Sequence, residues 1–223
     1  SGHADRGDEP DSVQPFVSAL YRAESDRTER KNGMNEGRKP MVIDMKAIHD
    51  SQRTLVMGVL NITEDSFSDG GLWLAPEAAK AHGEAMMKAG ADIIDIGAES
   101  TRPGAKRVSE ADEKARVLGA VDALIPEGAV LSIDTTRASV ALAALEHGAQ
   151  IINDVSGGQL DRELPHVVAD HSDCLYIVQH WRGWLAGAAG NVPDADTSRY
   201  EHGVVNDVYD ELRRQVDAVL EAA

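Results

Sequence analysis

The chain has 223 residues, of which 42% are apolar, and it carries 38 acidic against 22 basic residues, a formal net charge of −16. That length is sufficient for one sizeable domain, and the acidic excess argues against a general nucleic-acid-binding protein, which would carry a basic surface. The sequence lacks a run of about 18 apolar residues, so no membrane span is predicted. The single cysteine, Cys174, allows no intramolecular disulfide and indicates a reducing compartment, which predicts a cytoplasmic protein.

The first part of the chain differs from the rest in composition. Residues 1–40 are polar, charged and punctuated by glycine, which predicts a disordered or weakly structured extension. A regular pattern begins at Met41, so one domain is expected over residues 41–223. Its first two apolar runs, residues 41–48 and 54–60, are separated by polar residues and suggest a hairpin-like entry into the first main strand.

Strand-like and helical segments then alternate along the chain. The expected strands lie within residues 54–60, 91–98, 129–135, 150–158 and 174–181. The expected helices lie within residues 76–90, 109–128, 137–148, 161–171 and 200–223. Pro76 and Ser109 are typical helix starts, and Gly90 is a typical helix end. Near-continuous apolar strands that alternate with amphipathic helices predict a parallel sheet covered by helices.

Polar residues lie at the C-terminal side of every one of the expected strands. They are Asn61, the run from Glu99 to Arg102, Asp134 with Thr135, Asn153 with Asp154, and Gln179 with His180. A (β/α)8 barrel gathers all its strand ends at one mouth, whereas an open doubly wound sheet binds its ligand at one switch point. The repeated polar strand ends therefore favour the barrel. Because about three further βα units would be needed for closure, the predicted fold class is α/β, an incomplete (β/α)8 TIM barrel that is truncated at its C-terminal end.

The sequence MGVLNITEDSFSDGG, residues 57–71, places many short polar side chains and two glycines directly after the first strand. Taken alone, Asn61 is equally compatible with a turn cap. A long loop of this composition, however, is typical of a lid that orders over a substrate. An amide or carboxylate oxygen in it could bind a hard divalent cation, which would in turn bridge phosphate oxygens.

The sequence ESTRPGA, residues 99–105, places two hydroxyl side chains, Ser100 and Thr101, before Arg102 and a Pro-Gly turn. The planar guanidinium group of arginine suits phosphate or carboxylate. A surface arginine beside a turn is the alternative, but the preceding hydroxyl pair favours recognition of an anion.

Two apolar strands carry a polar residue near their ends: Asp134 in SIDT and Asn153 in IINDVSGG. A carboxylate at that depth requires a partner or the N–H groups of a ligand. Together the two side chains match the N–H and C=O edge of a fused heterocycle. Helix capping explains Asp154 better than Asn153, and His180 is interpreted as a histidine that is satisfied by its neighbours rather than a ligand.

Four motifs, MGVLNITEDSFSDGG, DIGAESTRPGA, SIDT and NDVSGG, resemble in order and spacing those of the dihydropteroate synthases. The resemblance extends from about Thr54 to the C-terminus, and its first two motifs are long enough to be highly specific. It implies a pterin-binding (β/α)8 barrel, a bacterial transferase of folate biosynthesis and a sulfonamide target. The implied reaction condenses (7,8-dihydropterin-6-yl)methyl diphosphate with p-aminobenzoate to give 7,8-dihydropteroate and diphosphate, with Mg²⁺ as the cofactor.

The resemblance also implies roles for individual residues. Asn61 would contact the magnesium–diphosphate unit, and Asp65 and Arg102 would take part in catalysis. The substrate-binding residues would be Ser100, Thr101, Asp134, Asn153 and Gln179. The complete enzyme would be a homodimer with two small-molecule substrates and no nucleic-acid or membrane partner.

Some features depart from the family pattern. Ala98 stands where the family usually has a second glycine, and Gln179 stands where many members have a methionine against the pterin. The later Asp-Pro-Gly, Ser-Arg-Lys and Arg-x-His elements are missing, so the chain alone is expected to be inactive. Two alternatives remain: a methyltetrahydrofolate methyltransferase-type barrel, which has no use for a diphosphate site, and a non-catalytic paralogue that binds pterin.

Overall fold

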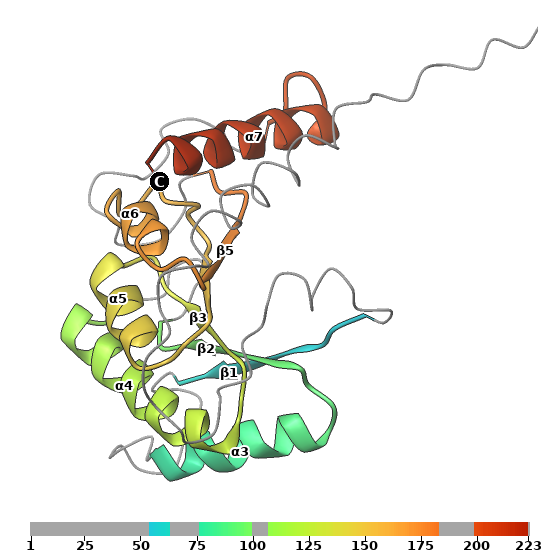
Figure 1. Cartoon of the computed structure of the whole chain (residues 1–223). Coiled ribbons are helices and arrows are strands. Elements are labelled where there is room, and N and C mark those ends of the chain that lie inside the picture. The colour runs from blue at the N-terminus through green and yellow to red at the C-terminus, as the bar shows by residue number, and fades with distance from the viewer. Residues whose placement is uncertain (1–53, 63–75, 100–106, 183–198, 223) are drawn as a thin grey trace, which may run out of the picture. The chain divides into compact units, whose positions relative to one another are not determined.

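Figure 1 shows the computed structural model of the chain, which describes residues 54–62, 76–99, 107–182 and 199–222. The predicted N-terminal extension, the domain start and most of the hairpin-like entry therefore lie outside the described residues. The same is true of the predicted site residues Asp65, Ser100, Thr101 and Arg102.

The described strands form one parallel sheet in chain order. They are β1 (Met57–Asn61), β2 (Ile93–Gly97), β3 (Leu131–Asp134), β4 (Ile151–Asp154) and β5 (Leu175–Val178). Each strand pairs with the next one along the chain, so β1 and β5 are the two edges of this sheet. Consecutive order in a five-stranded parallel sheet is the arrangement of a (β/α)8 barrel that has not closed. The predicted α/β fold class is therefore confirmed.

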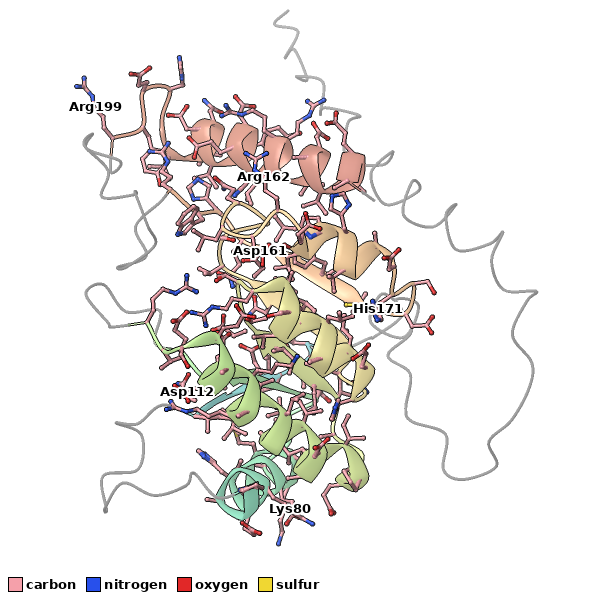
Figure 2. The ribbon with its side chains drawn as sticks, turned by 90° about the vertical axis from the view of Figure 1, so that its left-hand side faces the viewer. Lys80, Asp112, Asp161, Arg162, His171 and Arg199 are labelled. Atoms are coloured by element: carbon pink, nitrogen blue, oxygen red, sulfur yellow. The ribbon has the colours of Figure 1, made fainter. Side chains whose placement is uncertain are left out.

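A helix follows each strand of the sheet. The helices are α3 (Pro76–Lys88), α4 (Glu110–Leu124) with the short 3-10 helix η2 (Ile125–Glu127), α5 (Ala138–Glu146), α6 (Leu164–Ala169) and α7 (Val204–Ala222). Crossovers between parallel neighbours have a fixed hand, which returns successive helices to the same side of the sheet. Accordingly, α3, α4, α5 and α6 pack side by side in chain order over one face (Figure 1 and Figure 2). No helix among the residues that the structure describes is long and apolar enough to cross a membrane.

The two faces of the sheet differ in what they bury. The buried residues on the helix side include Leu60, Ile94, Ile96, Leu131, Ile133 and Ile152, together with Val117, Val121 and Leu124 of α4. Because neighbouring residues of a strand point to opposite faces, Ile93, Val130 and Ile151 form a second, smaller cluster on the other side. We call this second side the inner face. Nearer the carboxyl ends of the strands it becomes polar.

The predicted helix signals are present at α3 and α4. Helix α3 begins at Pro76, and Gly90 follows its end with a φ of 104°, a left-handed conformation that glycine adopts without steric cost. Ser109 caps α4, since its Oγ accepts a hydrogen bond from Asp112 N at 3.1 Å.

Two helices begin later than the sequence predicts. Helix α6 starts at Leu164 rather than at Asp161, because Asp161 Oδ1 accepts a hydrogen bond from Glu163 N at 3.1 Å in a turn before the helix, while its Oδ2 accepts one from Ala138 N at 2.8 Å at the start of α5. Helix α7 starts at Val204 because the preceding Gly203 has a φ of 91°, which a right-handed helix cannot include.

Candidate functional site

The parallel register brings residues at or next to the ends of four strands into one row. Asn61 of β1 pairs with Gly97 of β2, Gly97 with Asp134 of β3, and Asp134 with Asn153 of β4. We call these four residues the strand-end row. By the alternation of each strand they belong to the inner face, at the carboxyl ends where parallel α/β sheets place their ligands. Three residues that the sequence predicted for one site are thus neighbours in the structure.

A chain of hydrogen bonds crosses the inner face beside this row. Asn153 Nδ2 donates to Asp95 Oδ2 at 3.2 Å, and Gln179 Nε2 donates to Asn153 Oδ1 at 2.7 Å. Both ends of the Asn153 amide are engaged, so its orientation is set by these two partners. Asp95 lies on β2 and Gln179 follows β5, so the hydrogen bonds tie the site together across most of the sheet.

Two buried polar atoms on the inner face have no hydrogen-bond partner among the described residues. They are Asp95 Oδ1 and Ser132 Oγ, on residues that are 5% and 0% exposed. The register places Asp95 and Ser132 side by side on neighbouring strands. Because buried polar atoms are nearly always paired in folded proteins, these two mark a place suited to a ligand with complementary polar groups.

The electrostatics of the row centre on Asp134. Burial, followed by the negative charges of Asp95, Asp154 and Glu99, raises the pKa of Asp134 from 3.8 to about 7. A carboxyl group in this range can gain or lose a proton at neutral pH. The N–H groups of a ligand would favour its ionised form. A perturbed carboxyl within a polar cluster is typical of a functional site.

Gly97 leaves a space between two oxygen atoms of the row. A Cβ atom at this position would lie 3.4 Å from Asp134 Oδ2 and 3.6 Å from Asn61 Oδ1. Amide and carboxylate oxygens suit Mg²⁺, which commonly keeps its waters and binds phosphate with only one or two protein groups. The residues present therefore fit the cation predicted at Asn61. In the described parts of the chain, no group of three His, Cys, Asp or Glu residues could hold a metal ion by itself.

Comparison with known proteins identifies the family. A sequence profile described as pterin binding enzyme matches residues 57–223. The chain belongs to the pterin binding enzyme family. Among its relatives, the dihydropteroate synthase of Mycobacterium leprae is 50% identical over 127 residues, which cover 57% of this chain and 44% of that protein. The chain spans about half the length of the curated dihydropteroate synthases that it matches.

Solved structures of dihydropteroate synthases have the same fold. The enzyme of Clostridium difficile, crystallised in the presence of pteroic acid, superimposes with a TM-score of 0.67 at 33% identity, over 77% of this chain and 60% of that one. The enzyme of Xanthomonas albilineans with 4-aminobenzoic acid gives a TM-score of 0.64 at 37% identity, over 77% of this chain and 57% of that one. These similarities confirm the resemblance that the four motifs indicate.

In this pterin binding enzyme, two residues of the inner face were not predicted as site residues from the sequence. Asp95 lies between Ile94 and Ile96, and Ser132 lies between Leu131 and Ile133. A signal was available, because a carboxylate inside an apolar strand is costly without a partner. Asp95 precedes the end of β2 and reaches the site only across the sheet, so the pattern of polar strand ends does not include it.

Asp154 has a structural role in the pterin binding enzyme, but in the turn after β4 and not as a helix cap. Its carboxylate is fully buried and accepts four hydrogen bonds, each of 2.7 Å. The donors are the N–H and hydroxyl of Ser156, the N–H of Gly158 and the Tyr176 hydroxyl. These bonds close the turn after β4. Burial and the adjacent Asp154 charge raise the pKa of Tyr176, so this hydroxyl stays a donor.

Replacing Tyr176 with phenylalanine is therefore expected to lower the free energy of unfolding by about 1–2 kcal/mol, because one hydrogen bond to a buried charge is lost. Urea denaturation measures this difference. Tyr209→Phe is the matched control, since Tyr209 is 53% exposed on α7, and it should change stability little. Equal effects of the two substitutions would contradict the role assigned to the Tyr176 hydroxyl.

His180, the last residue of the polar run after β5, contacts an acidic residue of α7. Its Nε2 lies 2.7 Å from Glu211 Oε2, and Arg182 Nη2 lies 2.5 Å from the other oxygen of that carboxylate. The Arg182 and His180 contacts hold the pKa of Glu211 at about 2. A cavity of about 680 Å³ between the turn after β4, α6 and α7 is lined in part by Glu211 and Trp181, and it includes no residue of the strand-end row.

Proposed function

We propose that the complete protein is a dihydropteroate synthase, which condenses (7,8-dihydropterin-6-yl)methyl diphosphate with p-aminobenzoate to give 7,8-dihydropteroate and diphosphate. The observation that carries this proposal is the hydrogen-bonded series Asp95, Asn153 and Gln179 beside Asp134. The similarity to dihydropteroate synthases supports the same reaction, and two of the similar structures are of an enzyme complexed with 7,8-dihydropteroate and of an enzyme with 4-aminobenzoic acid.

The polar groups of the inner face suit the edge of a pterin ring. A pterin presents N–H donors next to a ring nitrogen and a carbonyl acceptor. Asp95 Oδ1 has no partner among the described residues, and Asp134 carries a carboxyl group that N–H donors would hold in its ionised form. Because Asn153 is already fixed by Asp95 and Gln179, the site is organised before a ligand arrives, which reduces the cost of binding.

The diphosphate end of the substrate is assigned to the Asn61 side of the row. Mg²⁺ bound there would neutralise the charge that develops on the departing diphosphate. Asn61 would orient that end of the substrate relative to the ring held by Asp134. Catalytic roles for Asp65 and Arg102, and substrate contacts from Ser100 and Thr101, remain predictions from the motifs. A cytoplasmic homodimer also remains a prediction for the complete protein.

Calorimetric titration of the 223-residue chain with a pterin diphosphate analogue, with and without Mg²⁺, tests this assignment. We expect binding that requires Mg²⁺ and that Asn61→Ala weakens about tenfold, the loss typical of one polar contact to a charged group. Asn206→Ala, on the exposed face of α7, is the matched control and should bind as the unsubstituted chain does.

Binding that is indifferent both to Mg²⁺ and to Asn61→Ala would contradict the diphosphate assignment. The reaction itself is tested on the complete protein, by following dihydropteroate formation from the two substrates. A folded complete protein that binds the pterin diphosphate but forms no product would favour the alternative of a non-catalytic paralogue.

A further inference from the structure

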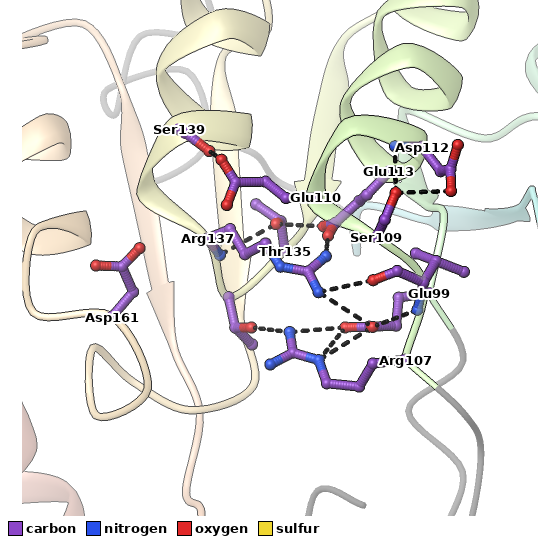
Figure 3. Close-up of polar contacts among 12 residues, drawn as sticks. Glu99, Arg107, Ser109, Glu110, Asp112, Glu113, Thr135, Arg137, Ser139 and Asp161 are labelled. Carbon is purple, nitrogen blue, oxygen red and sulfur yellow. Dashed lines mark hydrogen bonds and ion pairs between the residues drawn. The ribbon is translucent and has the colours of Figure 1, made fainter. Parts of the chain in front are cut away.

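A cluster of alternating charges lies where the chain leaves β2 and β3, a few residues after Gly97 and Asp134 of the strand-end row, and Figure 3 shows its polar contacts. It consists of two acidic residues, Glu99 and Glu113, and two arginines, Arg107 and Arg137, and we call it the clasp. Arg107 binds Glu99 through two guanidinium nitrogens, with Nη2 at 2.8 Å and Nε at 3.0 Å from Oε2. Arg137 pairs with Glu113, and its Nη2 lies 3.6 Å from Glu99 Oε1.

The clasp joins three segments at the carboxyl edge of the sheet. Val108 N, just before α4, donates to Glu99 Oε1 at 3.1 Å, and Arg137 Nη2 donates to the Val108 carbonyl at 2.9 Å. Arg107 Nη2 also donates to Thr136 Oγ1 at 3.0 Å. The end of β2, the start of α4 and the segment after β3 therefore converge on the Glu99 carboxylate.

The same segment leads directly into the site. Asp134 is the last residue of β3 and is followed by Thr135, whose N–H donates to the Asn153 carbonyl at 3.2 Å. The Thr135 hydroxyl donates in turn to Glu113 Oε1 at 2.6 Å. A movement of the segment after β3 would consequently change the spacing between Asp134 and Asn153, because both are connected to it through the backbone.

The clasp is sheltered from solvent, unlike an ordinary surface ion pair. The side chains of Glu99, Arg107 and Arg137 are 12%, 22% and 16% exposed, and that of Glu113 is 1% exposed. Sheltered ion clusters often stabilise a fold no more than apolar residues of the same volume would. The charged, bidentate contacts of the clasp instead contribute a fixed geometry.

We propose that Glu99 and Arg107 are positioning residues for the strand-end row: their paired side chains hold the segment after β3 through Thr136 and so set the spacing of Asp134 and Asn153 for a bound pterin. The pterin as ligand rests on the function proposed above, whereas the positioning follows from the contacts of the clasp. Neither side chain is required to touch the ligand.

The test compares Arg107→Met, which removes every donor of this side chain, with Arg107→Lys, which keeps the charge but not the planar fork. Amide hydrogen exchange and fluorescence titration with 6-hydroxymethylpterin are measured on the 223-residue chain. In Arg107→Met we expect faster exchange confined to residues 107–109 and 134–137, and about tenfold weaker pterin binding. Arg107→Lys should restore part of the protection from exchange and part of the pterin affinity. Arg213→Met removes the same charge from an exposed site on α7 and should change neither.

Faster exchange throughout the chain would show that Arg107 serves general stability alone and would overturn the proposal, as would unchanged exchange at residues 134–137. A local change in exchange without pterin binding by the unsubstituted chain would instead reject the proposed ligand and keep the positioning role. Glu99→Gln serves as a second variant should Arg107→Met fail to fold. It retains an acceptor for Val108 N, and we expect the same local exchange pattern in weaker form.

Discussion

Asp134→Asn is expected to raise the free energy of unfolding at pH 8 by about 1–3 kcal/mol while it removes pterin binding. Burial and neighbouring acidic residues raise the pKa of Asp134 to about 7 in the folded chain, against 3.8 in the absence of these effects. Each pKa unit corresponds to about 1.4 kcal/mol. Solvent still reaches part of the side chain, so only a fraction of the full difference is expected.

The sign of the pH dependence follows from the raised pKa. Between pH 3.8 and pH 7 the folded chain binds the Asp134 proton more tightly than the unfolded chain does. This residue therefore lowers stability progressively as the pH rises through that interval, and the loss is complete above about pH 7. Asparagine has no charge to desolvate, so the stability gain of Asp134→Asn should be large at pH 8 and small at pH 4.

Urea denaturation of Asp134→Asn at the two pH values measures this gain, and titration with a pterin measures the loss of binding. Asp217→Asn is the matched control, because Asp217 is 50% exposed on α7 and should give similar stability at both pH values. An equal gain at pH 4 and pH 8 would contradict the pKa argument. Opposite effects on stability and binding are typical of a group that is held in an unfavourable environment for function.

Arg137→Met is expected to lower the free energy of unfolding by about 3–5 kcal/mol, the cost of leaving a buried charge without its partner. The Glu113 side chain that Arg137 pairs with is 1% exposed. The Thr135 hydroxyl would remain as a hydrogen-bond donor to Glu113 but carries no positive charge. Loss of the Arg137 bond to the Val108 carbonyl adds to the destabilisation.

The double variant Glu113→Gln with Arg137→Met separates these contributions. Glutamine keeps an acceptor for the Thr135 hydroxyl and removes the buried charge. The double variant should therefore recover more than half of the stability lost in Arg137→Met. Urea denaturation of the single and double variants forms the double-mutant cycle. Additive losses in the double variant would show that the ion pair is not the source of the effect.

The agreement between sequence and structure is closest where local chemistry acts alone. Pro76, with its fixed φ, begins α3, and Gly90 follows the end of that helix in a left-handed conformation. The Ser109 hydroxyl caps α4. Each of these signals acts within one helical turn, so the sequence predicted all three. The start of α6 was placed too early because the Asp161 carboxylate is engaged in two other contacts. Its Oδ1 accepts a hydrogen bond from Glu163 N in a local turn, and its Oδ2 accepts one from Ala138 N, a residue distant in sequence whose contact no local pattern could reveal.

The sequence by itself determined the parallel α/β architecture and the residues at the strand ends, since apolar strands separated by amphipathic helices leave few other ways to bury both. Only the tertiary structure decided which of these residues cooperate. The strand register sets Asp134 beside Asn153, and hydrogen bonds across the sheet bring Asp95 and Gln179 to the same amide. The strand register and the burial of each side chain depend on contacts between strands that are far apart along the chain. The raised pKa of Asp134 likewise comes from burial and from charges on neighbouring segments, which no local stretch of sequence contains.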